Sequence, residues 1–344
     1  MNRQQPSPWP IIGHELAVSR LSWAVYEEQV AHAYLISGPD HIGKQTVAHT
    51  FAQALLCTNE HSRPCTTCRT CNLVQTNHHA DFIRLDLAWQ AQNLPEKSKS
   101  KFISVDAVRM ISRDLTRRPL EGRWKILIVP HVDEFTLAAS NAFLKTLEEP
   151  ASFVVILLTT HDAHLVLPTI RSRCQPILLF PLALEKVEEA LVNDKGLTRK
   201  QARFIAKISG GRIGWAIKAA ENKQLLEKRA SILASLQQAL KSNRAERLLQ
   251  AVPLSKENDI EVIRLWAGWW RDLLLIQNNA AEVISNIDQQ EQLQKAAQRY
   301  STEQVRSFLH ELQRLLRILR HTNVNTQLLW EVLLLKLPHY FRSS

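Results

Sequence analysis

Four of the five cysteines lie within fifteen residues of one another, in the pattern Cys57-x7-Cys65-x2-Cys68-x2-Cys71. Two successive Cys-x2-Cys steps bring sulfurs onto one tight turn, and Cys57 can complete a tetrahedron of four thiolates. Such a site has no open coordination position, so it predicts a structural Zn²⁺ and not a catalytic one. A redox pair and an iron–sulfur cluster are the alternative interpretations, and His61 is a competing ligand.

A second pattern is typical of phosphate binding. The segment GPDHIGKQT at residues 38–46 follows an apolar run and precedes a helical pattern. Its glycines let backbone N–H groups surround a phosphate, and the helix N-terminus favours negative charge. The residue after Lys44 should be Ser or Thr, whose hydroxyl holds Mg²⁺, but it is Gln45. We therefore predict a degenerate nucleotide site made of Gly38, Gly43, Lys44 and Thr46. Binding of ATP at this site is doubtful, and passive nucleotide binding is not excluded.

An ATPase also needs a pair of acids after a later strand, to hold Mg²⁺ and orient the attacking water. The apolar run Lys125–Val129 is instead followed by Pro130 and His131. Asp133 and Glu134 come three residues later, and we interpret them as surface residues or as the start of a helix. The sequence therefore predicts no intrinsic ATPase activity.

The elements that must position these residues alternate between strands and helices over the first 180 residues. Because near-continuous apolar strands alternate with helices, they predict a parallel sheet covered on both faces. The polar segment from Trp89 to Lys101 is expected to be a surface loop. We expect strands at 33–36, 82–85, 125–129 and 153–159, and helices after 44 and at 105–115 and 138–147.

The remainder of the chain has helical patterns only. This predicts three parts: an α/β domain at 1–180 with the cysteine insert at 57–71, a small helical domain at 181–222 and a helical C-terminal domain at 223–344. Capping boxes are expected at Thr198 and Ser301. The aromatic group Trp266, Trp269 and Trp270 fits an apolar helical face, so we favour core or subunit packing over base stacking.

The amino-acid composition limits the partners and the cellular location that we expect for the protein. The chain has 43 Lys and Arg against 33 Asp and Glu, a net charge of +10. This excess favours work near nucleic acid, although solvated helix surfaces also account for it. The N-terminus lacks the apolar core of a signal peptide, and no apolar run is long enough for a membrane span. We expect a cytoplasmic protein that has no membrane partner.

Several stretches together resemble one family, the AAA+ subunits of bacterial clamp loaders. Residues 141–150, NAFLKTLEEP, resemble its signature helix, and residues 169–174, TIRSRC, resemble its Ser-Arg-Cys motif. The HAYL segment at 32–35, the phosphate loop and the cysteines follow in the family's order. The resemblance is strong over 11–180, moderate to about 220 and weak beyond. It implies an AAA+ αβα domain of P-loop type, a helical lid at 181–222 and an oligomerisation collar at 223–344.

The chain departs from the family's motor subunits, gamma and tau. In these departures it resembles the family's non-hydrolysing delta-prime group. The motors keep Thr after the lysine, an Asp-Glu pair after the strand and a second-sensor arginine; here Gly214 matches the last position. The resemblance implies a DNA polymerase III subunit that acts in DNA replication. Its expected partners are gamma/tau and delta in a hetero-pentameric ring, and through them the sliding clamp and primed DNA.

Arg173 is the residue that the resemblance marks for function. In that family, the arginine of the motif reaches the ATP site of the adjacent motor and acts as an arginine finger in trans. A guanidinium suits this role because its planar fork pairs with phosphate oxygens. An exposed arginine without a role is the alternative for Arg173. Thr159 or Thr160 is a remnant of the first sensor or a strand-end cap.

Two other functions compete with this one. An active gamma/tau-type ATPase would need the residues that Gln45, Pro130 and His131 replace. A free zinc-dependent DNA-binding protein would need basic residues concentrated around the cysteines, where only Arg63 and Arg69 occur.

Overall fold

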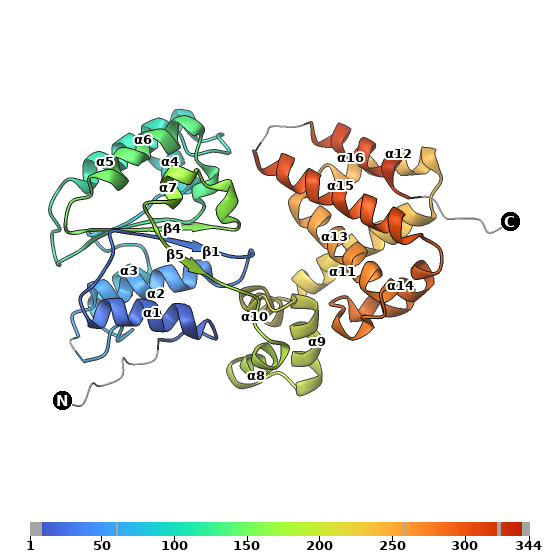
Figure 1. Cartoon of the computed structure of the whole chain (residues 1–344), viewed down its shortest axis with the longest axis horizontal. Coiled ribbons are helices and arrows are strands. Elements are labelled where there is room, and N and C mark those ends of the chain that lie inside the picture. The colour runs from blue at the N-terminus through green and yellow to red at the C-terminus, as the bar shows by residue number, and fades with distance from the viewer. Residues whose placement is uncertain (1–8, 60, 258, 322–324, 339–344) are drawn as a thin grey trace. The chain divides into compact units, whose positions relative to one another are not determined.

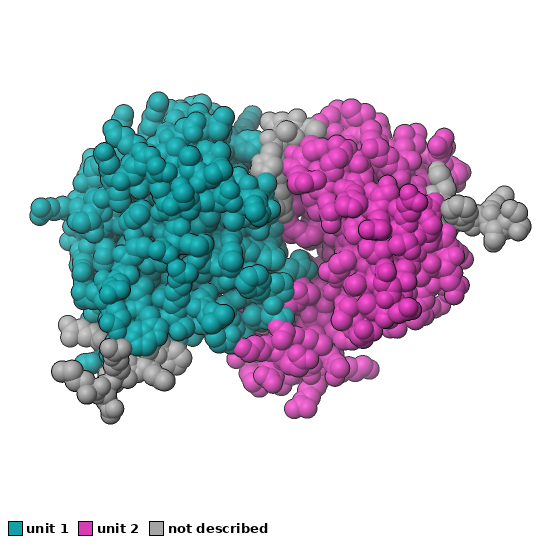
Figure 2. Space-filling view, viewed as in Figure 1, with its two compact units in different colours: residues 1–182, 212–214 teal, residues 183–211, 215–344 magenta. Residues whose placement is uncertain are grey.

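The computed structural model describes residues 9–59, 61–257, 259–321 and 325–338. Within them the chain forms two compact units, coloured separately in Figure 2. Unit 1 comprises residues 1–182 and 212–214, and unit 2 comprises residues 183–211 and 215–344. Among the described residues, no helix combines the length and the apolar character that crossing a membrane requires.

Unit 1 is built on a sheet of five parallel strands in the order β2-β3-β4-β1-β5. Every residue of β1, β3 and β4 is buried, as expected for central strands covered on both faces. Because all strands run the same way, the segments that follow them meet at one edge of the sheet. The strands are β1 (Ala33–Ser37), β2 (Phe82–Arg84), β3 (Lys125–Val129), β4 (Val154–Thr160) and β5 (Gln175–Leu178).

Helices cover both faces of this sheet, in the three-layer arrangement of Figure 1. Alternate residues of β3 point into different cores: Ile126 and Ile128 into one, Leu127 and Val129 into the other. This period of two confirms the predicted αβα architecture. One layer contains α1 (Glu15–Tyr26), α2 (Lys44–Leu56) and α3 (Arg69–Gln75). The other contains α4 (Leu87–Asn93), α5 (Val105–Leu115), α6 (Leu137–Glu148) and α7 (Pro168–Arg171).

Two expectations for unit 1 need correction. The expected loop at 89–101 is partly helical, with α4 and a 3-10 turn at Pro95–Lys97. Asp86 caps α4 by accepting a hydrogen bond from the Trp89 N–H, and the buried Gln90 bonds to the main chain of Phe102 and Ser104. Strand β5 was not expected, because most of its side chains are exposed and it contains a proline.

Unit 2 is entirely helical in its described residues, apart from its connecting segments. Trp266, Trp269, Trp270 and Trp330 are fully buried in its core, which confirms that the tryptophan group packs internally. The capping boxes at Thr198 and Ser301 are both formed. Its helices are α8 (Leu184–Lys195), α9 (Arg199–Ser209), most of α10 (Ile213–Glu221), α11 (Lys223–Lys241), α12 (Arg244–Leu254), α13 (Asp259–Gln277), α14 (Gln290–Ala297), α15 (Thr302–His321) and α16 (Thr326–Lys336), with 3-10 turns at Ala281–Val283 and Ile287–Gln289.

Candidate functional site

The phosphate loop lies between β1 and α2, where the sequence places it. Lys44 is only 6% exposed, and its ammonium group donates hydrogen bonds to the carbonyls of Gly38 (2.7 Å) and Pro39 (2.8 Å). Asp40 lies 3.8 Å from the same nitrogen. The cation that would contact a phosphate is therefore bound to the carbonyls of its own loop.

Two further carbonyls of the loop are held by residues from outside it. The buried His14 donates from Nε2 to the carbonyl of Ile42 at 2.9 Å, and the N–H of Gly214 donates to that of His41 at 2.9 Å. A Cβ at residue 214 would lie 2.8 Å from the His41 oxygen. A second-sensor arginine therefore has no room at this position, and the glycine locks the loop instead.

Gln45, at the position of the expected Mg²⁺ hydroxyl, faces a fixed cation. Its Oε1 accepts from Arg84 at 3.4 Å, and Arg84 also donates to Asp86 at 2.6 Å. His49 lies 3.4 Å from the same guanidinium, and burial, aided by this charge, lowers the pKa of His49 to about 4. A neutral His49 therefore accepts from Arg84. No motif marks Arg84 in the sequence, and only its place at the end of a strand could have signalled it.

Asp133 and Glu134 are partly buried, which corrects the interpretation of them as surface residues. They lie in a 3-10 turn, Val132–Glu134, that ends before α6 begins. Asp133 is 10% exposed and accepts from His161 at 3.0 Å; burial opposes its charge, but this hydrogen bond keeps its pKa below the usual value. Burial, with the charges of Asp133 and Asp86, raises the pKa of Glu134 to about 7.

Pro130 and the two threonines of β4 complete this edge of the sheet. The hydroxyl of Thr159 donates to the carbonyl of Pro130, and that of Thr160 donates to the carbonyl of Asp162 at 3.0 Å. Both threonines are fully buried. Burial also lowers the pKa of His131, which favours its neutral form. These side chains satisfy the protein's own backbone and present no acid at the end of β3.

The four cysteines meet at the far end of α2. Their sulfurs all lie within 4.8 Å of one another, and the pairs Cys57–Cys68 and Cys65–Cys71 are each 4.0 Å apart. A tetrahedral zinc with Zn–S bonds of about 2.3 Å places its sulfurs about 3.8 Å apart. The donor set and its spacing therefore fit a metal ion. Among the described residues, these cysteines form the one such cluster, and His61 is outside it.

Local structure explains why the sulfurs converge. Cys57 is the C-cap of α2, Cys68 is the N-cap of α3, and Cys71 lies in the first turn of α3. Backbone N–H groups point at three of the sulfurs, at 3.4–3.5 Å. Such donors stabilise thiolates, and those of Thr67 and Cys68 lower the pKa of Cys65 to about 6.

Arg173 lies between α7 and β5 and is 36% exposed. One guanidinium nitrogen donates to Glu148 Oε1 at 2.8 Å, and the other donates to the Thr169 carbonyl at 3.0 Å. The next residue, Cys174, is buried, and burial raises the pKa of its thiol to about 12. The structure therefore brings together residues of two motifs that lie apart in the sequence.

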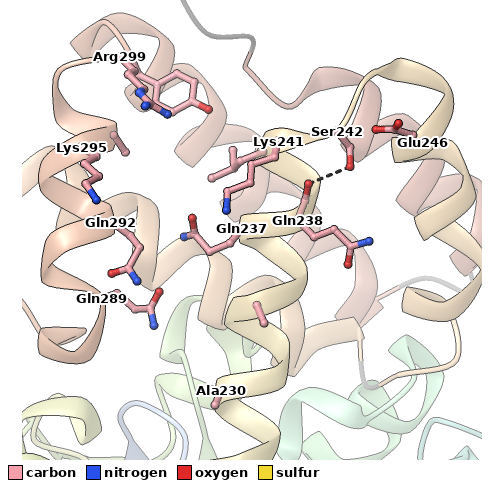
Figure 3. Close-up of a pocket in the computed structure, with 14 residues that line it drawn as sticks. Ala230, Gln237, Gln238, Lys241, Ser242, Glu246, Gln289, Gln292, Lys295 and Arg299 are labelled. Carbon is pink, nitrogen blue, oxygen red and sulfur yellow. Dashed lines mark hydrogen bonds between the residues drawn. The ribbon is translucent and has the colours of Figure 1, made fainter.

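Unit 2 has a groove of its own, with a cavity volume of about 860 Å³. Figure 3 shows Lys241 and Gln237 of α11 facing Lys295 and Gln292 of α14 across it. It contains none of the residues that the sequence marks for chemistry.

The parallel sheet, the phosphate loop between β1 and α2 and the helical second unit define a P-loop protein of the AAA+ class. The model of the family described as "DNA polymerase III, delta subunit" matches residues 13–183. A second model, described as "DNA polymerase III, delta subunit, C terminal", matches residues 223–339.

Relatives agree with this match. The chain is 30% identical to the DNA polymerase III subunit delta' of Pseudomonas aeruginosa over 72% of this chain and 71% of that protein. It is 27% identical to the delta' subunit of Bacillus subtilis, over 98% and 97%. The tau subunit of B. subtilis is 33% identical over 48% of this chain and 27% of tau. The chain belongs to the delta' family of DNA polymerase III subunits, as the sequence predicted.

Proposed function

We propose that this chain is a non-hydrolysing subunit of a clamp loader that places the sliding clamp on primed DNA. In this proposal it assembles with gamma/tau and delta subunits in a hetero-pentameric ring. Residues 1–180 serve as the AAA+ domain, 181–222 as the lid and 223–344 as the collar that joins the ring. Its membership of the delta' family and its similarity to tau support this assignment.

The observation that carries the proposal is the state of the phosphate loop. Lys44 is engaged by two loop carbonyls, Arg84 lies beside Gln45, and Gly214 and His14 hold two further carbonyls. Hydrolysis needs Mg²⁺ held by a hydroxyl and acids, and the residues at those positions are Gln45 and Pro130. The isolated chain should therefore not turn over ATP. Steady ATP turnover that is abolished by Lys44→Ala would disprove this.

Two retained sites would serve the assembly instead. The four cysteines would hold one structural Zn²⁺, which supplies folding free energy to the insert and no reaction step. Arg173 would act on the ATP site of a neighbouring motor, where a guanidinium stabilises transition-state charge on phosphate. Its partial exposure and its place at the end of a motif support that role.

The test is a complex reconstituted with Arg173→Ala. We expect normal assembly but a loss of about 10³-fold at the one ATP site that this residue serves, because an arginine finger contributes on that order. Total turnover should fall only partly, and clamp loading should fall more. Arg173→Lys should not restore it, because a point charge lacks the bidentate geometry.

The exposed Arg118 is the matched control. Arg118→Ala should leave loading unchanged. Normal loading by the complex that carries Arg173→Ala would mean that Arg173 is an ordinary surface arginine.

A further inference from the structure

Two motifs of the sequence meet in one ion pair. Helix α6 ends at Glu148, and Arg173 follows α7, 25 residues further along the chain. Glu148 accepts a hydrogen bond from one terminal nitrogen of the guanidinium, and the Thr169 carbonyl accepts one from the other. The plane of the guanidinium is thus set by the Glu148 carboxylate and the Thr169 carbonyl, with a longer contact of 3.4 Å to the Ser172 hydroxyl.

Glu148 occupies an unfavourable position for an acid. It is the last residue of α6, and Glu149 is the C-cap, so two carboxylates adjoin the helix end that carries partial negative charge. A residue that breaks a local preference often marks a functional site. Here the broken preference coincides with the ion pair to Arg173.

We propose that Glu148 is a positioning residue that directs Arg173 toward the neighbouring subunit; this rests on the proposed role of Arg173 as an arginine finger. A long arginine side chain loses rotational freedom when it binds phosphate, and an ion pair formed beforehand removes part of that loss. The terminal nitrogen that binds Glu148 carries a second N–H group, so a donor remains for a phosphate oxygen.

We favour the interpretation that Glu148 orients Arg173 over the alternative that it holds Arg173 in an inactive position. The Arg173 and Glu148 side chains are 36% and 48% exposed, and ion pairs this exposed are weak. Such a pair can bias the direction of the side chain, but it cannot compete strongly with a phosphate group.

The test compares reconstituted complexes that carry Glu148→Gln, which removes the charge and keeps the shape. We expect the kcat of ATP turnover at the served site to fall about three- to fivefold, the size that an exposed ion pair allows. The KM for ATP should stay unchanged, because the interaction acts in the transition state. The defect should shrink as salt screens the pair. The exposed neighbour Glu149 provides the control, and Glu149→Gln should have no effect.

A double variant separates this inference from the function on which it rests. Glu148→Gln added to Arg173→Ala should cause no further loss, because the two residues act as one unit. If Arg173→Ala alone leaves turnover unchanged, the role of Arg173 fails and this inference fails with it. If Arg173→Ala is defective while Glu148→Gln has no effect, raises the rate or adds to the double variant, only the positioning role of Glu148 is overturned.

Discussion

The sites at the two ends of α2 differ in how many of their expected groups are present and available. At its N-terminus, the phosphate loop keeps its glycines and lysine, yet the protein's own groups hold four of its carbonyls. At its C-terminus, the cysteine site keeps all four of its sulfur donors within 4.8 Å of one another. A metal site of this kind needs only convergent ligands, whereas a hydrolytic site also needs a hydroxyl, acids and water in register. A structural metal site is therefore of use to a fold without ATP hydrolysis, whereas a hydrolytic site is not.

The largest effect is expected at the cysteine end. Cys68→Ser should reduce zinc from about one ion per chain to near zero and unfold the insert locally, because structural zinc contributes folding free energy directly. Elemental analysis of the purified chain measures this, with limited proteolysis as the structural readout. Cys174→Ala, at the buried cysteine outside the cluster, should leave the zinc content unchanged. Full zinc content in the Cys68→Ser protein would contradict the site.

A smaller effect is expected at the phosphate end. Lys44→Ala should lower the free energy of unfolding by about 1–3 kcal/mol, because the carbonyls of Gly38 and Pro39 lose a buried partner. Clamp loading by the complex should be unchanged. Urea denaturation and a loading assay measure the two quantities, with the exposed Lys99→Ala as control. A loading defect without loss of stability would show that the loop still binds a ligand. The contrast between the phosphate loop and the cysteine site would then be wrong.

The smallest effect concerns Glu134, whose pKa of about 7 exceeds the ordinary glutamate value of 4.5. Between these values, the folded chain keeps a proton that the unfolded chain releases, so stability should fall as pH rises from about 4.5 to 7. Glu134→Gln should therefore be more stable than the wild type at pH 8, by about 1–2 kcal/mol after allowance for partial exposure, and similar near pH 4.5.

Denaturation at the two pH values measures the effect of Glu134→Gln, and Glu149→Gln should show no such difference. Well below pH 7, Mg²⁺ should not stabilise the wild-type chain, because Glu134 is then protonated and Asp133 accepts a hydrogen bond from His161. A stabilisation by Mg²⁺ would mean that the phosphate end has kept a metal site.

Periodicity and spacing predicted most of unit 1. The apolar runs gave β3 and α5 with their observed bounds, and the cysteine spacing predicted the cluster. What failed depends on tertiary contacts. Helix α4 is held by the buried Gln90, and Asp133 accepts a hydrogen bond from His161, 28 residues away. The partners of the phosphate loop, His14 and Arg84, come from distant segments, and only the position of Arg84 at the end of a strand gave a local signal.

The buried tryptophan pairs of unit 2 provide a spectroscopic signal from its core, which adds to that of Trp9, stacked on Phe51 in unit 1. Trp266 and Trp330 meet edge to face with ring centroids 5.4 Å apart, as do Trp269 and Trp270. Rings held this rigidly give a near-ultraviolet circular dichroism signal that disappears when side-chain packing is lost. Zinc release would report on unit 1 independently. Following both signals through one denaturation would therefore reveal whether the two units unfold together or in sequence.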